Sequence, residues 1–504
     1  MARTGPAPVR AHVCPCAAEC ASCVRTMSKS RVLVRRISSS AIDPYDRQPY
    51  TDHAFAETHP DRLAVVARLS GWEPPELGSA RILELGCGRG GNLLPMATSL
   101  PGASLVGIDR SGRQVDEAAR IAREAGVGNV RFERADIESY ASEDRFDYVV
   151  CHGVCSWVPA ETRRALLALA GRSLAPGGIA YVSFNVLPGW YDKLAARDWL
   201  RMFPADDARA SLAWLHGAVS PEHGDYRRRL DAVASRIRDA GAAYATHEYL
   251  AEEQHPQHVS SFLAEARDAG LEYLGDAIPS HAAIEMLPEP VAKRAESLDV
   301  AQVQQLVDFV RATAFRRTLL VRSEDARARG WRWPLRLEPR AVSGLRVASR
   351  LVPHAPRDTG AASERFDGPG GSVLVIDPTT RRALHRLGEV APRSLPFAQV
   401  AGDELFDLWL STGGIDFHAH EPSLGDGLSA RPEACPVARW HAAHGGTITN
   451  RWHQEVVLPD PVLRRVLSLL DGTRTVDDVG SALATHEVAR ASVRAIARAA
   501  LLVR

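Results

Sequence analysis

Short apolar runs alternate with amphipathic helical patterns over residues 80–185. The helix predicted after the second run begins at Ser111, which can cap Gln114, and another is predicted over 160–173, ending at a Pro-Gly-Gly turn at 176–178. This alternation predicts an open, doubly wound parallel sheet of the α/β class. The predicted strands are ARILELG (80–86), SLVGID (104–109), VRFERA (130–135), FDYVVCHG (146–153) and IAYVSFN (179–185).

The pattern changes after Trp190. Residues 191–322 show helical spacing of apolar residues without a further strand pattern, so the sequence predicts a separate helical unit there. Residues 323–370 are rich in Pro, Arg and Gly, which predicts a linker or a few irregular strands. Short helices and strands are expected from there to the C-terminus as a third domain.

Length and charge narrow the choice of function only slightly. The 504 residues are enough for three domains, on a prior of roughly 150 residues each. The 61 Lys and Arg residues balance 61 Asp and Glu residues, so no net positive charge attracts nucleic acid or an anionic membrane. No uncharged apolar run reaches the roughly 18 residues of a spanning helix, and the N-terminus lacks an apolar signal core. We therefore expect a soluble, cytoplasmic protein without membrane insertion.

Residues 1–40 differ from the rest of the chain because their basic side chains face a single acid, Glu19. We predict a disordered extension. A transit peptide and a start codon assigned upstream of Met27 both stay open as its origin. Cys16, Cys20 and Cys23 have the C-x3-C-x2-C spacing of an iron–sulfur ligand set, but Ser22 stands where such sets usually carry an aromatic. Since no strand precedes them, we predict no metal site.

The stretch RILELGCGRGGN (81–92) carries the chemistry of the first domain. Gly86, Gly88 and Gly91 satisfy G-x-G-x-x-G, a loop that brings bare backbone against a nucleotide ligand at the end of the first strand. Either a dinucleotide or S-adenosylmethionine could occupy such a loop. Glu84 favours the second, because a carboxylate would repel a pyrophosphate but balance the cationic end of a sulfonium amino acid.

Two further acids follow the next strands. Asp109 ends the second strand, where a carboxylate can accept both ribose hydroxyls. Asp136 follows the third strand with Ile137 beside it, which suits an adenine amino group and an apolar wall. These residues occur in the order found in class I S-adenosylmethionine-dependent methyltransferases, which the chain resembles over about residues 55–190.

Flanking stretches resemble a narrower group, the bacterial methyltransferases with a methyltransferase regulatory domain and a winged-helix-like C-terminal domain. Described members of that group are lysine methyltransferases of outer-membrane proteins. The resemblance covers about 41–504 and implies a Rossmann-like, seven-stranded methyltransferase sheet. It rests on THPDRLA (58–64), ELGCGRGGNLLPMA (84–97), HGVCSWVP (152–159), YVSFNVLPGW (181–190), HEYLAEE (247–253), DFVRATAFRRTLL (308–320), GTITNRWHQEVVL (446–458) and LLDGTRTVDDV (469–479).

The resemblance implies four segments and two sets of site residues. The segments are an extension (1–40), a methyltransferase domain (41–190), a helical regulatory domain (191–330) and a winged-helix-like domain (331–504). Trp157, Asn185 and Tyr50 are the candidate catalytic residues, at the mouth of an acceptor channel. Cys155 departs from the pattern, which has an aromatic there. The candidate cofactor-binding residues are Glu84, Gly86, Cys87, Gly88, Gly90, Asn92, Asp109, Arg110, Asp136, Ile137 and His152.

The expected activity is methyl transfer from S-adenosylmethionine to a lysine amine of a protein substrate. A small molecule or a peptide natural product is the alternative acceptor, because the same core serves several acceptor types. A second alternative is a nucleic-acid-binding regulator that senses the cofactor. The segment DELFDLWL (403–410) is acidic and would be repelled by phosphates, so we predict no nucleic-acid partner.

Overall fold

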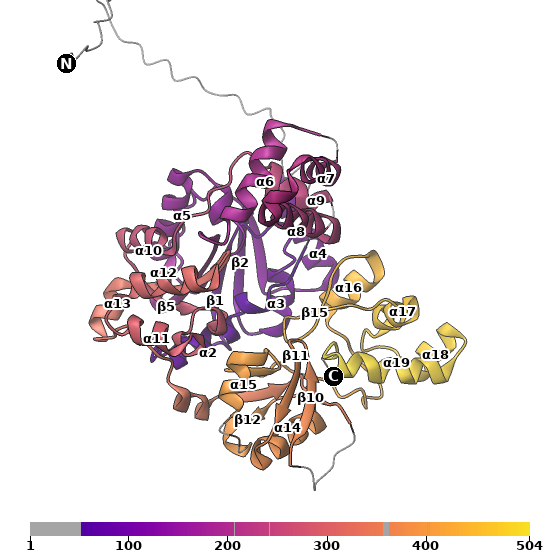
Figure 1. Ribbon diagram of the computed structural model, residues 1–504. Coiled ribbons are helices and arrows are strands. Elements are labelled where there is room, and N and C mark those ends of the chain that lie inside the picture. The colour runs from indigo at the N-terminus through magenta and orange to yellow at the C-terminus, as the bar shows by residue number, and fades with distance from the viewer. Residues whose placement is uncertain are drawn as a thin grey trace, which may run out of the picture. The chain divides into compact units, whose positions relative to one another are not determined.

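The computed structural model describes residues 52–205, 207–240, 242–355, 362–400, 402 and 404–503. Within these residues, seven strands form one twisted sheet in the order β3-β2-β1-β4-β5-β7-β6 (Figure 1). The strands are β1 (Arg81–Leu85), β2 (Ser104–Asp109), β3 (Val130–Arg134), β4 (Phe146–Cys151), β5 (Leu174–Asn185), β6 (Leu271–Asp276) and β7 (Phe315–Arg322).

The five parallel strands are those that the apolar runs predict. β1 is central in this half and pairs with both β2 and β4, so that Glu84 lies beside Gly107 on one side and Val150 on the other. The carboxyl ends of the parallel strands therefore meet at one edge of the sheet, where ligands bind in open α/β folds. The Pro-Gly-Gly stretch at 176–178 is not a turn before β5, as expected, but an irregular segment within it.

The expectation of a separate helical unit after Trp190 is wrong in one respect. β6 and β7 both come from that region, and they complete the sheet: β7 pairs antiparallel with β5 along Asn185–Ala180, and β6 pairs antiparallel with β7. The rest of the region is helical, as predicted. Its helices are α6 (Tyr191–Met202), α7 (Ala208–Ala218), α8 (Gly224–Ala240), α9 (Ala242–Ala245), α10 (Val259–Asp268), α11 (Glu289–Ala295), α12 (Val300–Arg311) and α13 (Ser323–Ala328), with a π-turn at Thr246–Leu250.

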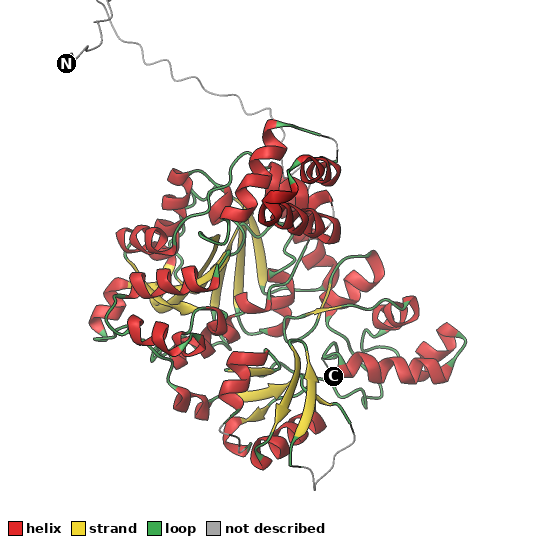
Figure 2. Cartoon of the chain, viewed as in Figure 1, coloured by secondary structure: helices red, strands yellow, loops and turns green. Residues whose placement is uncertain are grey.

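Helices cover both faces of the sheet (Figure 2). Side chains alternate between the faces along β1, so that Ile82 belongs to one core and Leu83 to the other. The Leu83 face packs on α5 (Ala160–Ser173) and α10. The Ile82 face packs on α2 (Pro60–Leu69), α3 (Leu93–Ser99) and α4 (Gly112–Ala125), and α4 begins at Ser111, which accepts from Gln114 as predicted.

The C-terminal region from residue 331 has two parts. The first contains β8 (Arg346–Ser349), β9 (Val352–Pro353), β10 (Glu364–Gly368), β11 (Gly371–Val375), β12 (Leu395–Pro396) and β13 (Ile415–His418), with α14 (Pro378–Val390) and α15 (Leu405–Thr412). The second contains α16 (Pro436–His444), β14 (Ile448–Thr449), β15 (Glu455–Val456), α17 (Pro461–Leu469), α18 (Val476–Leu483) and α19 (His486–Arg498). Apolar residues of the second part, such as Val437 and Ile496, share a continuous core with α3 and α4.

Three findings bear on the remaining predictions. Cys87, Cys151, Cys155 and Cys435 are buried free thiols. The 1–40 extension with its four cysteines lies outside the described residues, as does Asp403 of the acidic segment. Among the described residues, no helix is long and apolar enough to cross a membrane, and no cluster of three or more His, Cys, Asp or Glu side chains is arranged to hold a metal ion.

Candidate active site

The loop between β1 and α3 is shaped by glycine. Gly86, Gly88 and Gly90 have φ of 76°, 53° and 79°, which L-residues with a side chain rarely adopt. A Cβ on Gly86 would lie 2.5 Å from Val154, and one on Gly90 would lie 2.9 Å from Phe132. The third glycine of the motif, Gly91, is not in the left-handed region but abuts Asp52. The loop thus presents bare backbone at the carboxyl edge of the sheet.

Glu84 lies beneath this loop and is 3 % exposed. Its Oε1 accepts a hydrogen bond of 2.7 Å from Asn92 Nδ2, whereas its Oε2 is buried and has no partner among the described residues. Burial raises the pKa of Glu84 to about 8; the Asn92 bond opposes this shift and the nearby Asp109 adds to it. A buried carboxyl oxygen without a partner is costly, which indicates that a cationic ligand group completes the site.

Asp109 fixes the loop from the neighbouring strand. Its Oδ2 accepts from Gly88 N at 2.9 Å and its Oδ1 accepts from Ser111 N at 2.9 Å. These two bonds position the carboxylate at the end of β2, facing the glycine loop. Cys87 is buried next to it, and burial raises the pKa of its thiol.

The other predicted cofactor residues on this side are more open. Asp136 is exposed, and its Oδ1 accepts from Glu138 N at 3.0 Å in a turn after β3. Ile137 is partly buried against the core beside it. Arg110 is exposed, and its backbone oxygen accepts from Arg134 Nε. Asp136 and Ile137 therefore lie after the third strand at the carboxyl edge of the sheet, and their roles toward adenine stay a prediction.

Aromatic rings surround the end of β4. The His152 ring stacks on Phe55 at 3.7 Å between centroids, and its Nδ1 lies 2.8 Å from the hydroxyl of Tyr181. Burial lowers the pKa of His152 to about 4, so the ring is neutral at pH 7. A base this weak cannot retain a proton taken from an amine. Its surroundings therefore favour a packing or backbone role over proton transfer.

Asn185 is the last residue of β5, and Trp157 lies in a short helical turn after β4. Ser156 Oγ accepts from Asn185 N at 2.7 Å, which ties the two strand ends together. The ring of Trp157 packs edge-on against Trp190, 6.5 Å away. Asn185 Nδ2 and Trp190 Nε1 are buried donors without a partner in the described part of the chain. Tyr50, the third candidate catalytic residue, lies outside the described residues.

Two groups at this site have no signal in the sequence. Gln257 lies alongside Asn185, where its N–H donates to Asn185 O at 3.1 Å and its Nε2 is buried without a described partner. Gln254 is buried three residues earlier, with both side-chain polar atoms likewise unpaired. They come from the segment between the π-turn and α10. Trp190 Nε1 is, like the side-chain nitrogens of Gln254 and Gln257, a buried donor without a described partner.

The second group with no signal is His453, 361 positions after Asn92. Its Nε2 lies 2.8 Å from Asn92 Oδ1, in a buried contact. In the sequence, His453 is only one position of the C-terminal stretch GTITNRWHQEVVL (446–458), and nothing there links it to the cofactor loop. Its arrival beneath the glycine loop results from tertiary packing.

These residues fit S-adenosylmethionine by their donor chemistry. The unpaired Glu84 oxygen matches an ammonium, the Asp109 carboxylate matches a diol, and the glycine backbone leaves room for a ligand chain. A pyrophosphate would instead meet the Glu84 carboxyl beneath the loop.

Three family models match successive parts of the chain. A methyltransferase domain matches residues 82–178, a predicted methyltransferase regulatory domain matches 241–322, and the C-terminal winged helix domain of PKMT matches 430–495. The structure of PKMT2 from Rickettsia typhi in complex with AdoHcy superposes with a TM-score of 0.80 at 25% identity, covering 90% of this chain and 100% of that one. The chain belongs to the class I S-adenosylmethionine-dependent methyltransferases.

Two curated relatives of this methyltransferase come from Rickettsia prowazekii (strain Madrid E). The uncharacterized protein RP789 is 33% identical over 56% of this chain, and the chain spans only 53% of its length. The uncharacterized protein RP028 is 33% identical over 44% of this chain and is covered over 93% of its length. The predicted family, cofactor and α/β fold class are thus confirmed, whereas the exact domain boundaries and the roles of individual residues stay predictions.

Proposed function

We propose that this methyltransferase transfers a methyl group from S-adenosylmethionine to a lysine side-chain amine of a protein. The observation that carries the cofactor assignment is the buried, unpaired Oε2 of Glu84 beneath the glycine loop. Support for a protein acceptor comes from the likeness to PKMT2 over nearly the whole chain, since PKMT abbreviates protein lysine methyltransferase.

When bound, S-adenosylmethionine supplies an electrophilic methyl group. The chain's own residues hold and orient the reactants. Glu84 pairs with the amino-acid ammonium, Asp109 accepts from the ribose hydroxyls, and Asp136 with Ile137 holds the adenine edge. In-line displacement depends mainly on alignment, which can supply several kcal/mol. The fixed glycine loop therefore contributes to catalysis mainly by aligning the cofactor.

The acceptor enters by the wall that Asn185, Trp157 and Trp190 form at the ends of β4 and β5. A lysine amine loses a proton before it attacks, from a group with a pKa near about 10.4 in water. A dry, apolar channel favours the neutral amine, because burial disfavours the charged form. Asn185 and Gln257 carry side-chain amides at this wall, and their amide oxygens would accept from the N–H bonds of the amine.

The test is incubation of a bacterial lysate with the purified protein and radiolabelled S-adenosylmethionine. We expect label in protein bands, and amino-acid analysis of those bands to recover methylated lysine. Label confined to small molecules would refute the protein acceptor and favour the alternative. Failure of the cofactor to bind, measured by calorimetry, would refute the enzyme itself.

A further inference from the structure

The C-terminal domain reaches into the cofactor site through one histidine. His453 is fully buried and lies in the short turn Asn450–Gln454, between β14 and β15. Its φ of 59° turns the chain so that the ring meets the methyltransferase domain. Such a conformation is uncommon for a residue with a Cβ and persists where surrounding bonds hold it.

The contact has a defined donor and acceptor. Phe55 N can only donate, and it donates to Asn92 Oδ1 at 3.1 Å, which fixes the orientation of the amide. The same oxygen also accepts from Thr58 Oγ1 at 3.0 Å. His453 Nε2 must therefore carry its proton to make its 2.8 Å bond to Oδ1. Asn92 Nδ2 in turn donates to Glu84 Oε1 at 2.7 Å.

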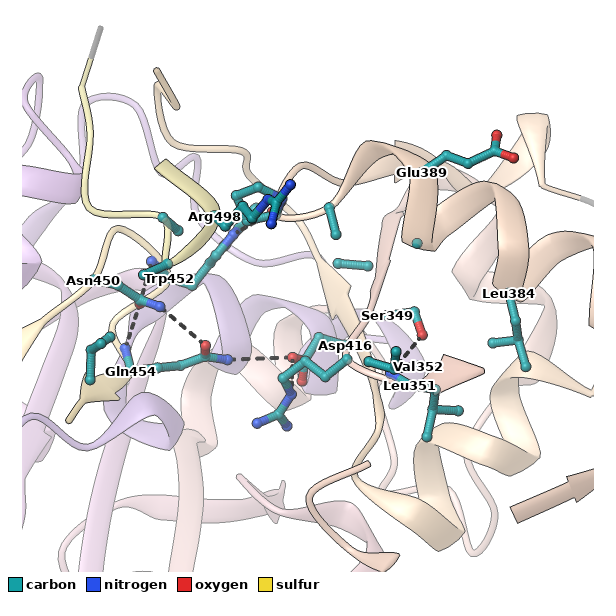
Figure 3. Close-up of a pocket in the computed structure, with 18 of the residues that line it drawn as sticks. Ser349, Leu351, Val352, Leu384, Glu389, Asp416, Asn450, Trp452, Gln454 and Arg498 are labelled. Atoms are coloured by element: carbon teal, nitrogen blue, oxygen red, sulfur yellow. Dashed lines mark hydrogen bonds and ion pairs between the residues drawn. The ribbon is translucent and has the colours of Figure 1, made fainter. Parts of the chain in front are cut away.

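The turn that carries His453 is firmly held. Asn450 Oδ1 accepts from the backbone of Trp452 and Gln454, each at 3.0 Å. Trp452 Nε1 donates to Pro392 O at 2.8 Å. On its far side the turn lines a cavity of about 740 Å³ with Asn450, Trp452 and Gln454 (Figure 3). The turn is therefore a wall between that cavity and the cofactor loop.

The same turn holds both ends of the helix that follows the glycine loop. His453 contacts Asn92, the residue before α3, and Arg451 donates to Thr98 O in the last turn of α3. Arg451 is buried and also donates to Ser423 O at 3.1 Å. Two side chains of the same turn, Arg451 and His453, thus hold α3 at both of its ends.

We propose that His453 is a positioning residue of the cofactor site: by donating to Asn92 it holds the amide that presents Glu84 to the ligand ammonium. This rests on the proposed cofactor role of Glu84. The C-terminal domain is then part of the cofactor site. His453 Nδ1 is also buried and has no partner among the described residues. The bond from Nε2 to Asn92 is therefore the one hydrogen bond that the ring makes within the described part of the chain.

The test compares three variants by calorimetric titration with S-adenosylhomocysteine, each with its melting temperature. His453→Ala should raise the Kd about tenfold or more, because Asn92 loses the shortest of the three contacts that fix its amide beside Glu84. His453→Gln restores an amide donor at similar reach and should recover most of the affinity. His385→Ala is the matched control: it removes another side-chain bond of the C-terminal region, 2.8 Å to Glu364, on α14 and away from the glycine loop.

His385→Ala should lower the melting temperature without changing the Kd. The proposal is overturned if His453→Ala binds as tightly as the wild type, if His453→Gln is as weak as His453→Ala, or if His385→Ala weakens binding equally. Failure of the proposed function is a separate outcome, since the wild type itself would then not bind the ligand.

Discussion

At the scale of the residue, the Glu84 carboxyl is matched to a cation that arrives with the ligand. Burial raises its pKa to about 8, so at pH 7 the ligand-free group is mostly protonated. Pairing with an ammonium requires the ionised form. Ligand binding must therefore expel the proton.

We expect binding of S-adenosylhomocysteine at pH 7 to release close to one proton. The measurement is calorimetry in two buffers with different ionisation enthalpies. Because the buffer takes up the released proton, the two observed binding enthalpies should differ by nearly the difference between the two ionisation enthalpies. Affinity should increase as the pH rises toward 8. Glu84→Gln should bind weakly and show no buffer dependence attributable to this group. Equal enthalpies in both buffers for the wild type would contradict the assignment.

The same carboxyl makes the ligand-free protein less stable as the pH rises. Its folded-state pKa of about 8 lies above the ordinary value of 4.5, so the folded state binds more protons between these values. Unfolding then becomes easier with increasing pH across that window. Glu84→Gln removes this dependence. Its melting temperature relative to the wild type should therefore be higher at pH 8 than at pH 5, and a difference that is constant with pH would refute the argument.

Asp109 and Trp157 should separate binding from turnover. Asp109→Ala removes the acceptor of Gly88 N and Ser111 N, so the loop loses its shape and cofactor binding should be lost. Trp157→Ala opens the proposed acceptor wall but leaves the loop intact, so binding should persist while methyl transfer falls. Calorimetry and the radiolabel assay measure the two effects. Equal loss of binding in both variants would show that the roles are wrongly divided.

At the scale of the element, the parallel half of the sheet could be predicted and the antiparallel half could not. β1, β2 and β4 are runs of apolar residues, so their own sequences are enough to predict buried strands. β7 begins with Phe315, Arg316 and Arg317, which does not look like a buried strand. Arg316 is nevertheless buried, because its Nε donates to Asp308 at 2.9 Å and its Nη1 donates to Gln304 at 2.8 Å. The partners that allow Arg316 to be buried lie on another element, α12. The apolar pattern of β7 alone therefore does not predict a buried strand.

This network gives a prediction about stability. Asp308→Ala should destabilise the protein by about 3–5 kcal/mol, because the buried Arg316 guanidinium loses its nearer carboxylate partner and keeps only Asp276, 3.6 Å from its Nη1. The double variant Asp308→Leu with Arg316→Met should recover part of the loss, since an apolar pair of similar volume can replace a buried ion pair. Thermal denaturation measures both. Glu117→Ala, which breaks the exposed pair with Arg120, is the control and should cost less than about 1 kcal/mol.

At the scale of the whole molecule, the cofactor site is assembled from three distant parts of the chain. The sequence located the glycine loop and the acids after β1, β2 and β3, because each lies next to its own strand. It did not locate Gln257 or His453. Gln257 reaches the site by lying along the end of β5, and His453 reaches it through the packing of the C-terminal helices on α3 and α4. Neither contact has a local sequence pattern.

This assembly predicts that ligand binding is felt in the C-terminal domain. Pairing of Glu84 with a ligand strengthens its bond to Asn92, and hence the hold on His453, so the turn at 450–454 should open less often. In hydrogen exchange followed by mass spectrometry, S-adenosylhomocysteine should protect the glycine-loop peptides and also peptides spanning 446–458. Helix α14 lines the same cavity as the turn at 450–454. Its backbone should exchange at an unchanged rate, because it does not contact the glycine loop. Protection confined to the loop itself would mean that the C-terminal domain packs on the cofactor site without responding to it.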